Sequence, residues 1–153
     1  LDIRAIEGTT NAAGDAPTLP DLLAQIPDEE RIVSVGGDGA YDTKDCHAAI
    51  AERGADPIIP VRRNGRSWTK DGPGVDARNE TLRAMKYLGR TIWKKWSGYH
   101  RRSLVETKMH CFKLLGSRLA ARTFERQITE LKVRAAILNR FSQIGTPNTV
   151  RVV

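Results

Sequence analysis

Long apolar runs are missing from this chain of 153 residues. No segment approaches the roughly 18 consecutive apolar residues that a membrane-spanning helix needs, and no charged-then-apolar segment resembles a secretory signal. Cysteine is also scarce, because Cys46 and Cys111 are the only two in the sequence. Two cysteines are too few for a disulfide framework and suit a reducing compartment. We therefore expect a cytoplasmic protein without membrane partners.

Several patterns of catalytic and metal sites are absent as well. The sequence has no phosphate-cradling P-loop and no Ser-His-Asp order, so acyl-transfer chemistry has no support. The neighbouring pairs Cys46–His47 and His110–Cys111 lack the short-loop ligand spacing of structural zinc. We also find no internal repeat and no low-complexity tract.

Positive charge is what the chain has in excess. It contains 25 Lys and Arg against 18 Asp and Glu, which gives a formal net charge of +7 and an isoelectric point near 9.8. This balance favours an acidic polymer as partner, and nucleic acid is the commonest one. The alternative is a charged surface that only keeps the protein in solution. The length suits one domain.

Residues 1–61 have the patterns of strands and helices that build a sheet. Residues 1–8 alternate and carry β-branched side chains, which predicts a strand. A short helix is expected in LPDLLAQIP, opened by Pro20 and terminated by Pro27. The apolar run from Ile32 to Val35, which ends at two glycines, is typical of a buried strand.

After those glycines we expect first a connecting helix and then a second strand. The helix starts near Asp42 or Thr43, either of which can cap it, and Gly54 ends it. Within this helix Cys46, Ala49 and Ile50 face inward. Residues 57–61 form the next strand candidate, so the unit reads as a right-handed crossover.

The second half of the chain is basic and helical. Residues 62–80 are rich in Gly, Arg and Asp and lack periodicity, which predicts a long functional loop. Residues 81–144 are mainly helical, with a strong helix over 118–141 that repeats apolar residues at steps of four and three. The tail from 145 to 153 contains Pro147 and suggests a late extended segment.

Asp38 is the first candidate for chemistry. It follows Gly36 and Gly37 at the expected carboxyl end of a strand, where sites collect in open sheets. The glycines leave room for a metal or a phosphate to approach the backbone. The alternative is an ordinary strand-to-helix turn in which Asp38 or Asp42 is only a cap.

The stretch GYHRRSLVETKMHCFKLLG holds Tyr99, Arg102, Glu106 and Lys113 at fixed spacing. In a helix, with about 100° of rotation per residue, the four side chains fall within roughly a 60° arc. The opposite face, with Leu104 as its first apolar residue, is expected to pack on the sheet. The alternative is an ordinary helix with a salt pair between Arg102 and Glu106 at i,i+4.

Together these residues resemble the Tyr-Arg-Glu-Lys signature of bacterial insertion-sequence transposases of the DDE type. The blocks GGDGAYDTKDCHAAIAERGADPIIPVRRNG and FERQITELKVRAAILNRF resemble the same family, and the similarity covers nearly the whole chain. The resemblance implies an α/β, ribonuclease-H-like fold: a mixed sheet flanked by helices, here truncated at its amino-terminal strand. Residues 1–153 would then be part of a transposase catalytic domain.

The resemblance also implies the roles of single residues. Asp38 and Glu106 match catalytic acids that hold Mg²⁺, with Mn²⁺ as a substitute. Tyr99, Arg102 and Lys113 match residues that bind the transposon end. The partners implied are double-stranded DNA at the transposon ends, target DNA, and a second copy of the chain in a synaptic complex.

One acid of the family pattern has no match here. The first aspartate lies on a strand upstream of the one that opens this chain, and Asp2 is a poor substitute because its block aligns with the next strand. Since the chain starts at Leu1, we expect a fragment that is inactive alone. The alternatives are a remnant that binds DNA without catalysis and a nuclease of similar fold.

Basic and aromatic side chains interleave around the expected site. Cations can neutralise phosphates, and aromatic faces can stack on a splayed base. For the tryptophans the alternative is a place in the core. The residues are Arg62, Arg63, Arg66, Lys70, Arg90, Lys94, Lys95, Arg101 and Arg102, with Trp68, Trp93, Trp96 and Tyr99.

Overall fold

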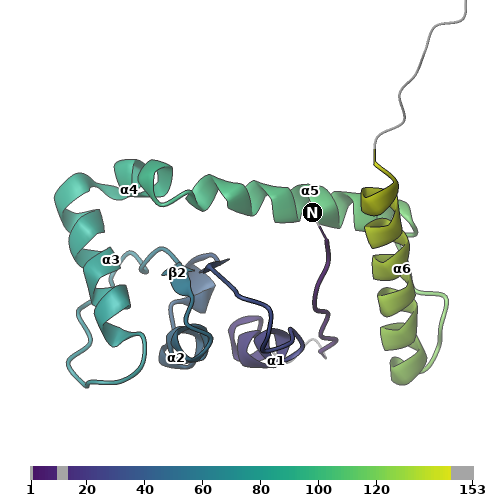
Figure 1. The fold of residues 1–153 in the computed structure, drawn as a ribbon, viewed down its shortest axis with the longest axis horizontal. Helices are drawn as coiled ribbons and strands as arrows, with labels where there is room; N and C mark the ends of the chain where they lie inside the picture. Colours follow the sequence, from purple (N-terminus) through teal and green to yellow (C-terminus); the bar gives the residue numbers. More distant parts are fainter. Residues whose placement is uncertain (1, 10–13, 146–153) are drawn as a thin grey trace, which may run out of the picture. The chain divides into compact units, whose positions relative to one another are not determined.

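The computed structural model describes residues 2–9 and 14–145, which fall into two compact units. We call residues 9–103 the sheet unit, and residues 1–8 with 104–153 the helical unit. Helices predominate, and the described residues form one small parallel sheet of two strands (Figure 1). The molecule is therefore a mixed α/β protein.

The sheet unit is built around a strand–helix–strand motif. Strand β1 (Ser34–Gly36) pairs in parallel with β2 (Asp56–Ile58), with Val35 opposite Pro57. Helix α2 (Lys44–Glu52) connects the two strands. A parallel pair needs such a crossover, and the predicted motif is confirmed in order and direction.

The core of the sheet unit lies where α2 meets α1 (Leu19–Ala24) and the sheet. Cys46 and Ile50 on α2 expose 0%, and Ile59 after β2 exposes 1%. Thr43 caps α2, because its hydroxyl accepts a hydrogen bond from the Cys46 amide at 3.3 Å. The predicted cap and the predicted inward face of this helix are both confirmed.

Helical segments complete the sheet unit. They are the 3₁₀ turns η1 (Ala16–Thr18), η2 (Gly39–Tyr41) and η3 (Tyr99–Arg102), with helices α3 (Val75–Leu88) and α4 (Arg90–Trp96). Gly89, at a φ of 85°, separates α3 from α4. The expected loop over 62–80 is shorter than predicted, because residues 75–80 already belong to α3. The basic side chains of that segment obscure its helical start, which only Gly74 at a φ of 76° marks.

The helical unit contains α5 (Ser103–Leu114, its first residue counted in the sheet unit) and α6 (Phe124–Ile144). Helix α6 starts six residues later than predicted, at an extended Thr123, and its stripe buries Ala135 and Leu138. Residues 2–9 form no strand, contrary to our prediction. Instead, the Asn139 side chain bonds both backbone groups of Ile3, at 2.7 and 2.8 Å.

Two predicted apolar faces are more open than expected. Val33, in the expected buried strand, exposes 66%, because the described sheet has only two strands to cover it. Helix α5 contains no buried residue, so the packing of its Leu104 face on a sheet stays a prediction. The predicted extended tail lies outside the described residues, apart from Gly145. Among the helices of residues 2–9 and 14–145, none is both long and apolar enough to cross a bilayer.

Candidate active site

Asp38 lies two residues beyond the end of β1, as its position in the sequence predicted. It is the N-cap of η2, and its Oδ1 accepts a hydrogen bond from the Ala40 amide at 2.8 Å. Its Oδ2 lies 3.8 Å from Nη2 of Arg102. The Asp38 side chain is 45% exposed, so the carboxylate keeps open lone pairs that face solvent. Asp38 is thus both a cap and an accessible acid.

Asp42, four residues later, has a different environment. Its carboxylate is 2% exposed and accepts two hydrogen bonds from Arg78, at 3.0 Å from Nε and 3.2 Å from Nη2. The Arg62 amide donates a third, at 3.1 Å. His47 Nε2 lies 3.5 Å from the same group. Both oxygens are therefore occupied by protein donors.

The electrostatics of Asp42 follow from these contacts. Burial alone would raise the pKa of Asp42. The nearby His47 ring, hydrogen bonds from Arg78 and the Arg62 backbone, and the charge of Arg78 outweigh burial and hold the pKa of Asp42 below its usual range. The contact with His47 is the longest of these, so we assign more of the effect to Arg78. Asp42 is ionised in the folded protein and neutralises a buried cation.

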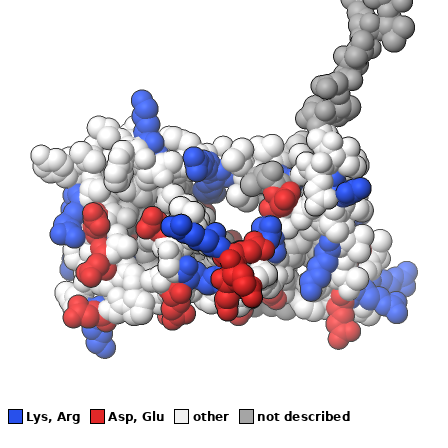
Figure 2. Space-filling model, viewed as in Figure 1, with Lys and Arg blue, Asp and Glu red and all other residues white. Residues whose placement is uncertain are grey.

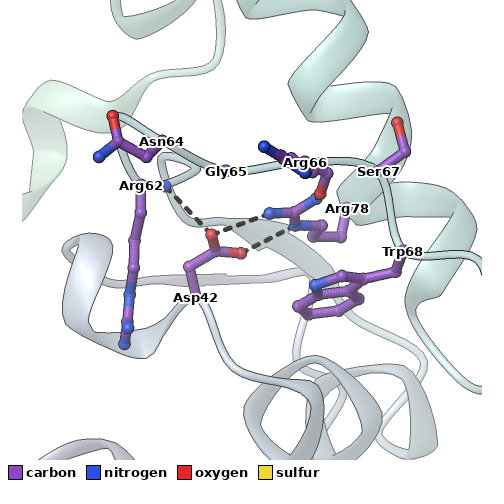
Figure 3. Close-up of a pocket in the computed structure, with 8 residues that line it drawn as sticks. All are labelled: Asp42, Arg62, Asn64, Gly65, Arg66, Ser67, Trp68 and Arg78. Atoms are coloured by element: carbon purple, nitrogen blue, oxygen red, sulfur yellow. Dashed lines mark hydrogen bonds and ion pairs between the residues drawn. The ribbon is translucent and has the colours of Figure 1, made fainter.

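An open pocket of about 370 Å³ lies beside this ion pair. Figure 3 shows the Asp42 carboxylate between the Arg62 backbone and the Arg78 guanidinium, with the Trp68 ring beside that guanidinium. The Arg78 guanidinium carbon lies 4.5 Å from the centre of the Trp68 ring. Because Asp42 already balances Arg78, this pocket offers less positive charge than its arginines suggest.

The two aspartates differ in whether they can hold a metal ion. Mg²⁺ takes hard oxygen ligands, and the exposed Asp38 carboxylate has this chemistry. Asp42 does not fit, because a metal ion would have to displace the buried Arg78. Within residues 2–9 and 14–145 no group of three or more His, Cys, Asp or Glu comes together. A metal at Asp38 would thus need further ligands from elsewhere in the protein.

The four residues of the predicted Tyr-Arg-Glu-Lys signature occupy two consecutive elements. Tyr99 and Arg102 lie in η3, and Glu106 and Lys113 lie in α5. The expected single helix is therefore wrong at its start, where Gly98 adopts a φ of 73° and a 3₁₀ turn precedes α5. Glu106 and Lys113 are exposed and, seven residues apart, share a face of α5. In the sheet unit, the structure brings Arg102 to Asp38.

The aromatic residues divide between core and surface. Trp93 is buried at 3% exposure and packs at 6.0 Å from the Tyr99 ring, whereas Trp96 is 76% exposed. The Nζ of Lys94 lies 5.1 Å from the centre of the Tyr99 ring. The core alternative thus holds for Trp93 and fails for Trp96.

Some of the expected basic cluster serves the protein itself. Arg90 donates to the Val61 carbonyl, and Arg62 donates to the carbonyls of Gly39 and Ala40. On the face seen in Figure 2, basic and acidic side chains are interspersed over the surface. The net charge of +7 is therefore not gathered into one basic patch on that face.

Sequence reasoning missed the group in which Asp42, His47 and Arg78 are buried beside the half-buried Trp68. The sequence predicts Asp42 only as a cap, and Arg78 lies in the segment that is expected to be a loop. The sequence signal nearest to this group is the position of Asp42, just before the helix whose inward face carries Cys46 and Ile50.

Comparison with known families gives a match over most of the chain. A family model described as Transposase DDE domain matches residues 2–140, which is most of the chain. No solved structure gives a significant match. The matched range includes β1 with Asp38, the buried Asp42–Arg78 pair and the whole Tyr99–Lys113 segment. The chain belongs to the DDE-type transposases.

Proposed function

We propose that this chain acts in DNA transposition of a bacterial insertion sequence, as part of a ribonuclease-H-like catalytic domain. Its substrates are the duplex ends of the element and the target DNA. Asp38 and Glu106 are the proposed ligands of Mg²⁺, and Tyr99, Arg102 and Lys113 the proposed contacts to the transposon end. The protein works in the cytoplasm, on two ends held by two copies of the chain.

One observation supports this assignment most strongly. Asp38 lies just past the carboxyl end of β1, is exposed, and has the Arg102 guanidinium 3.8 Å away. An acid and a cation side by side at a strand end can serve a phosphodiester: the cation compensates phosphate charge while the acid binds metal. In the same turn, Asp42 is excluded from this role by its buried partner Arg78.

The proposed chemistry is two phosphoryl transfers. In the first, a water oxygen forms a bond to the scissile phosphorus and the bond to the 3′ oxygen breaks, which leaves a 3′ hydroxyl. In the second, the oxygen of that hydroxyl forms a bond to a phosphorus of the target strand, the bond from that phosphorus to the target's own 3′ oxygen breaks, and the target strand is left with a free 3′ hydroxyl. Magnesium held by the carboxylates of Asp38 and Glu106 would activate the attacking oxygen and stabilise the leaving one. The chain's own part is to supply carboxylate oxygens and to neutralise phosphate charge through Arg102 and Lys113.

The test is metal-dependent nicking of a duplex that carries the element's own end. This chain is compared with a version extended by the codons upstream of Leu1, and each with its Asp38→Asn and Glu106→Gln variants. The proposal is supported if the duplex is nicked in the presence of Mg²⁺ or Mn²⁺ and if each of the two substitutions alone abolishes the nicking.

The control is Asp42→Asn, measured with its unfolding curve, since Asp42 has a structural role and its loss should lower stability first. Salt-sensitive DNA binding without nicking by either version would instead favour a remnant that binds DNA and catalyses nothing. Nicking that survives both Asp38→Asn and Glu106→Gln would contradict the ligand assignment.

A further inference from the structure

Arg62 directs all of its described hydrogen bonds at the turn that carries Asp38. Its Nε donates to the Gly39 carbonyl at 3.0 Å, and its Nη2 donates to the Ala40 carbonyl at 3.0 Å. Its backbone N–H donates to Asp42 Oδ2 at 3.1 Å. In Figure 3 the Arg62 side chain runs away from the Asp42 carboxylate that its backbone contacts. One residue thus holds the turn at three points.

The hold on Gly39 reaches Asp38 through a single peptide group. The Gly39 carbonyl, which accepts from Arg62, belongs to the same planar peptide as the Ala40 amide, which donates to Asp38 Oδ1 at 2.8 Å. A hydrogen bond to the carbonyl also polarises the amide on the other side of that peptide. Arg62 therefore orients the donor that orients the Asp38 carboxylate.

This turn needs an external hold. Gly37 and Gly39 flank Asp38, and glycine gives the backbone the widest conformational freedom. Since the Asp38 side chain is 45% exposed, burial does not fix it. The turn is anchored at its far end, where Asp42 is paired with buried Arg78. The half of the turn next to Asp38 has backbone hydrogen bonds, such as the one from the Tyr41 amide to the Asp38 carbonyl at 3.1 Å, and Arg62 adds a side-chain hold on the carbonyls of Gly39 and Ala40.

Arg62 is exposed, and so is its neighbour Arg63. In a basic protein both would be expected to face the nucleic acid. The guanidinium of Arg62 is nevertheless committed to two neutral carbonyls of the chain. Arg63 makes no hydrogen bond or ion pair with any residue that the structure describes, which makes it a matched control of the same type and exposure.

We propose that Arg62 is a positioning residue that fixes the Asp38 carboxylate in its metal-binding orientation through the Gly39–Ala40 peptide. This inference rests on the proposed function of Asp38. Partners of this kind, which orient a metal ligand, typically change metal affinity or activity by about 10- to 100-fold when removed.

The test measures the turn and the metal separately in Arg62→Gln, with Arg63→Gln as the control. Amide hydrogen exchange, followed by NMR in the metal-free chain, reports the Ala40 N–H. Mn²⁺ binding to the chain on its end DNA, followed by the electron paramagnetic resonance of the free ion, reports the metal site. Circular dichroism melting shows that each variant is folded. Arg62→Lys, which keeps the positive charge and a donor group at the end of a long side chain, is a milder second variant.

We expect Arg62→Gln to speed Ala40 exchange and to weaken Mn²⁺ binding about tenfold, while Arg63→Gln changes neither. Arg62→Lys should fall between Arg62→Gln and the unmodified chain. Unchanged Ala40 exchange in Arg62→Gln would overturn the inference. A second result would also overturn it: Arg62→Gln and Arg63→Gln lose DNA affinity equally, and Mn²⁺ binding is unchanged in both. Arg62 would then be a phosphate contact.

Failure of the proposed function would look different. If Asp38→Asn leaves Mn²⁺ binding unchanged, Asp38 is not a ligand, and the positioning role falls with it. The Ala40 exchange would still show whether Arg62 holds the turn, so the two failures are distinguishable.

Discussion

At the scale of single residues, the two aspartates of the GDGAYD turn divide the work between structure and chemistry. Asp42 is buried and paired with Arg78, whereas Asp38 is accessible. Such a buried pair contributes little net stability, yet removal of one partner strands the other charge and typically costs about 3–5 kcal/mol. The same residue type, four positions apart, is thus structural in one place and available for catalysis in the other.

We predict that Asp42→Asn destabilises the sheet unit by about 3 kcal/mol near neutral pH, because Arg78 loses its counter-charge. The folded protein lowers the pKa of Asp42 below its ordinary value of 3.8. Its contribution is therefore fully present above that value and is lost as the pH falls through the lower, folded-state pKa. Urea unfolding between pH 2 and 7 should show a steep loss of stability in acid for the unmodified chain and a flatter profile for Asp42→Asn.

The control is Asp71→Asn, which removes an equal charge from an exposed loop position. Its unfolding free energy should match that of the unmodified chain at each pH. Equal pH profiles for the unmodified chain and Asp42→Asn would contradict the assigned role of Asp42.

The position of Asp38 could be predicted, whereas the partner of Asp42 could not. A strand that ends in glycines followed by an acid is a local pattern, and three residues of sequence suffice to place it. Arg78 lies 36 positions from Asp42, and only the fold brings the two together. Arginine is rarely buried unless it is paired, and the partner of Arg78 is too distant in the sequence to be recognised. The residues around Arg78 therefore do not show that it is buried.

At the scale of elements, α2 shows how local signals define a helix. The Thr43 hydroxyl caps its start with a hydrogen bond of 3.3 Å to the Cys46 amide. Thr123 occupies the same N-cap position before α6, but its side chain makes no capping hydrogen bond. The chain therefore has two threonines at N-cap positions, one whose side chain caps its helix and one whose side chain does not.

We predict that Thr43→Ala costs about 1 kcal/mol of unfolding free energy, since it removes a side-chain cap. Thr123→Ala should cost clearly less, because no capping bond is lost. Urea denaturation of the two variants under one set of conditions checks the difference. Equal losses of unfolding free energy in the two variants would mean that the hydrogen bond of Thr43 does not stabilise the protein.

Elements that depend on distant partners were predicted less well. A strand needs a neighbouring strand, whereas the backbone of Ile3, in residues 2–9, is bonded by the Asn139 side chain. The expected single helix over the signature fails at Tyr99 because the 3.6-residue period alone does not reveal a 3₁₀ turn. In α2, by contrast, cap, inward face and terminal glycine all lie within the segment itself.

At the scale of the whole molecule, the contacts define two compact units. The single domain expected from the length of the chain stays a prediction. Asp38 and Arg102 belong to the sheet unit, and Glu106 and Lys113 to the helical unit. The proposed function therefore requires residues of both units to act on one DNA end. This requirement can be tested from the DNA side and from the metal side.

On the DNA side, we predict that Lys113→Gln lowers the salt dependence of binding to the transposon end. Loss of one phosphate contact should reduce the slope of log affinity against log salt by about 0.9. Lys132→Gln, an equivalent change at an exposed position of α6, is the control and should leave the slope unchanged. The measurement is a titration of end DNA at several salt concentrations, and equal slopes for all three proteins would count against Lys113 as a phosphate contact.

On the metal side, iron-directed cleavage of the polypeptide tests the central claim most directly. Fe²⁺ with ascorbate and peroxide replaces Mg²⁺ in the protein bound to its end DNA, and the radicals formed cut the chain near the ion. We predict cuts within a few residues of both Asp38 and Glu106, suppressed by excess Mg²⁺ and lost at both places in Glu106→Gln. Cuts at only one of the two acids, or cuts that Mg²⁺ does not suppress, would contradict a metal site shared by Asp38 and Glu106.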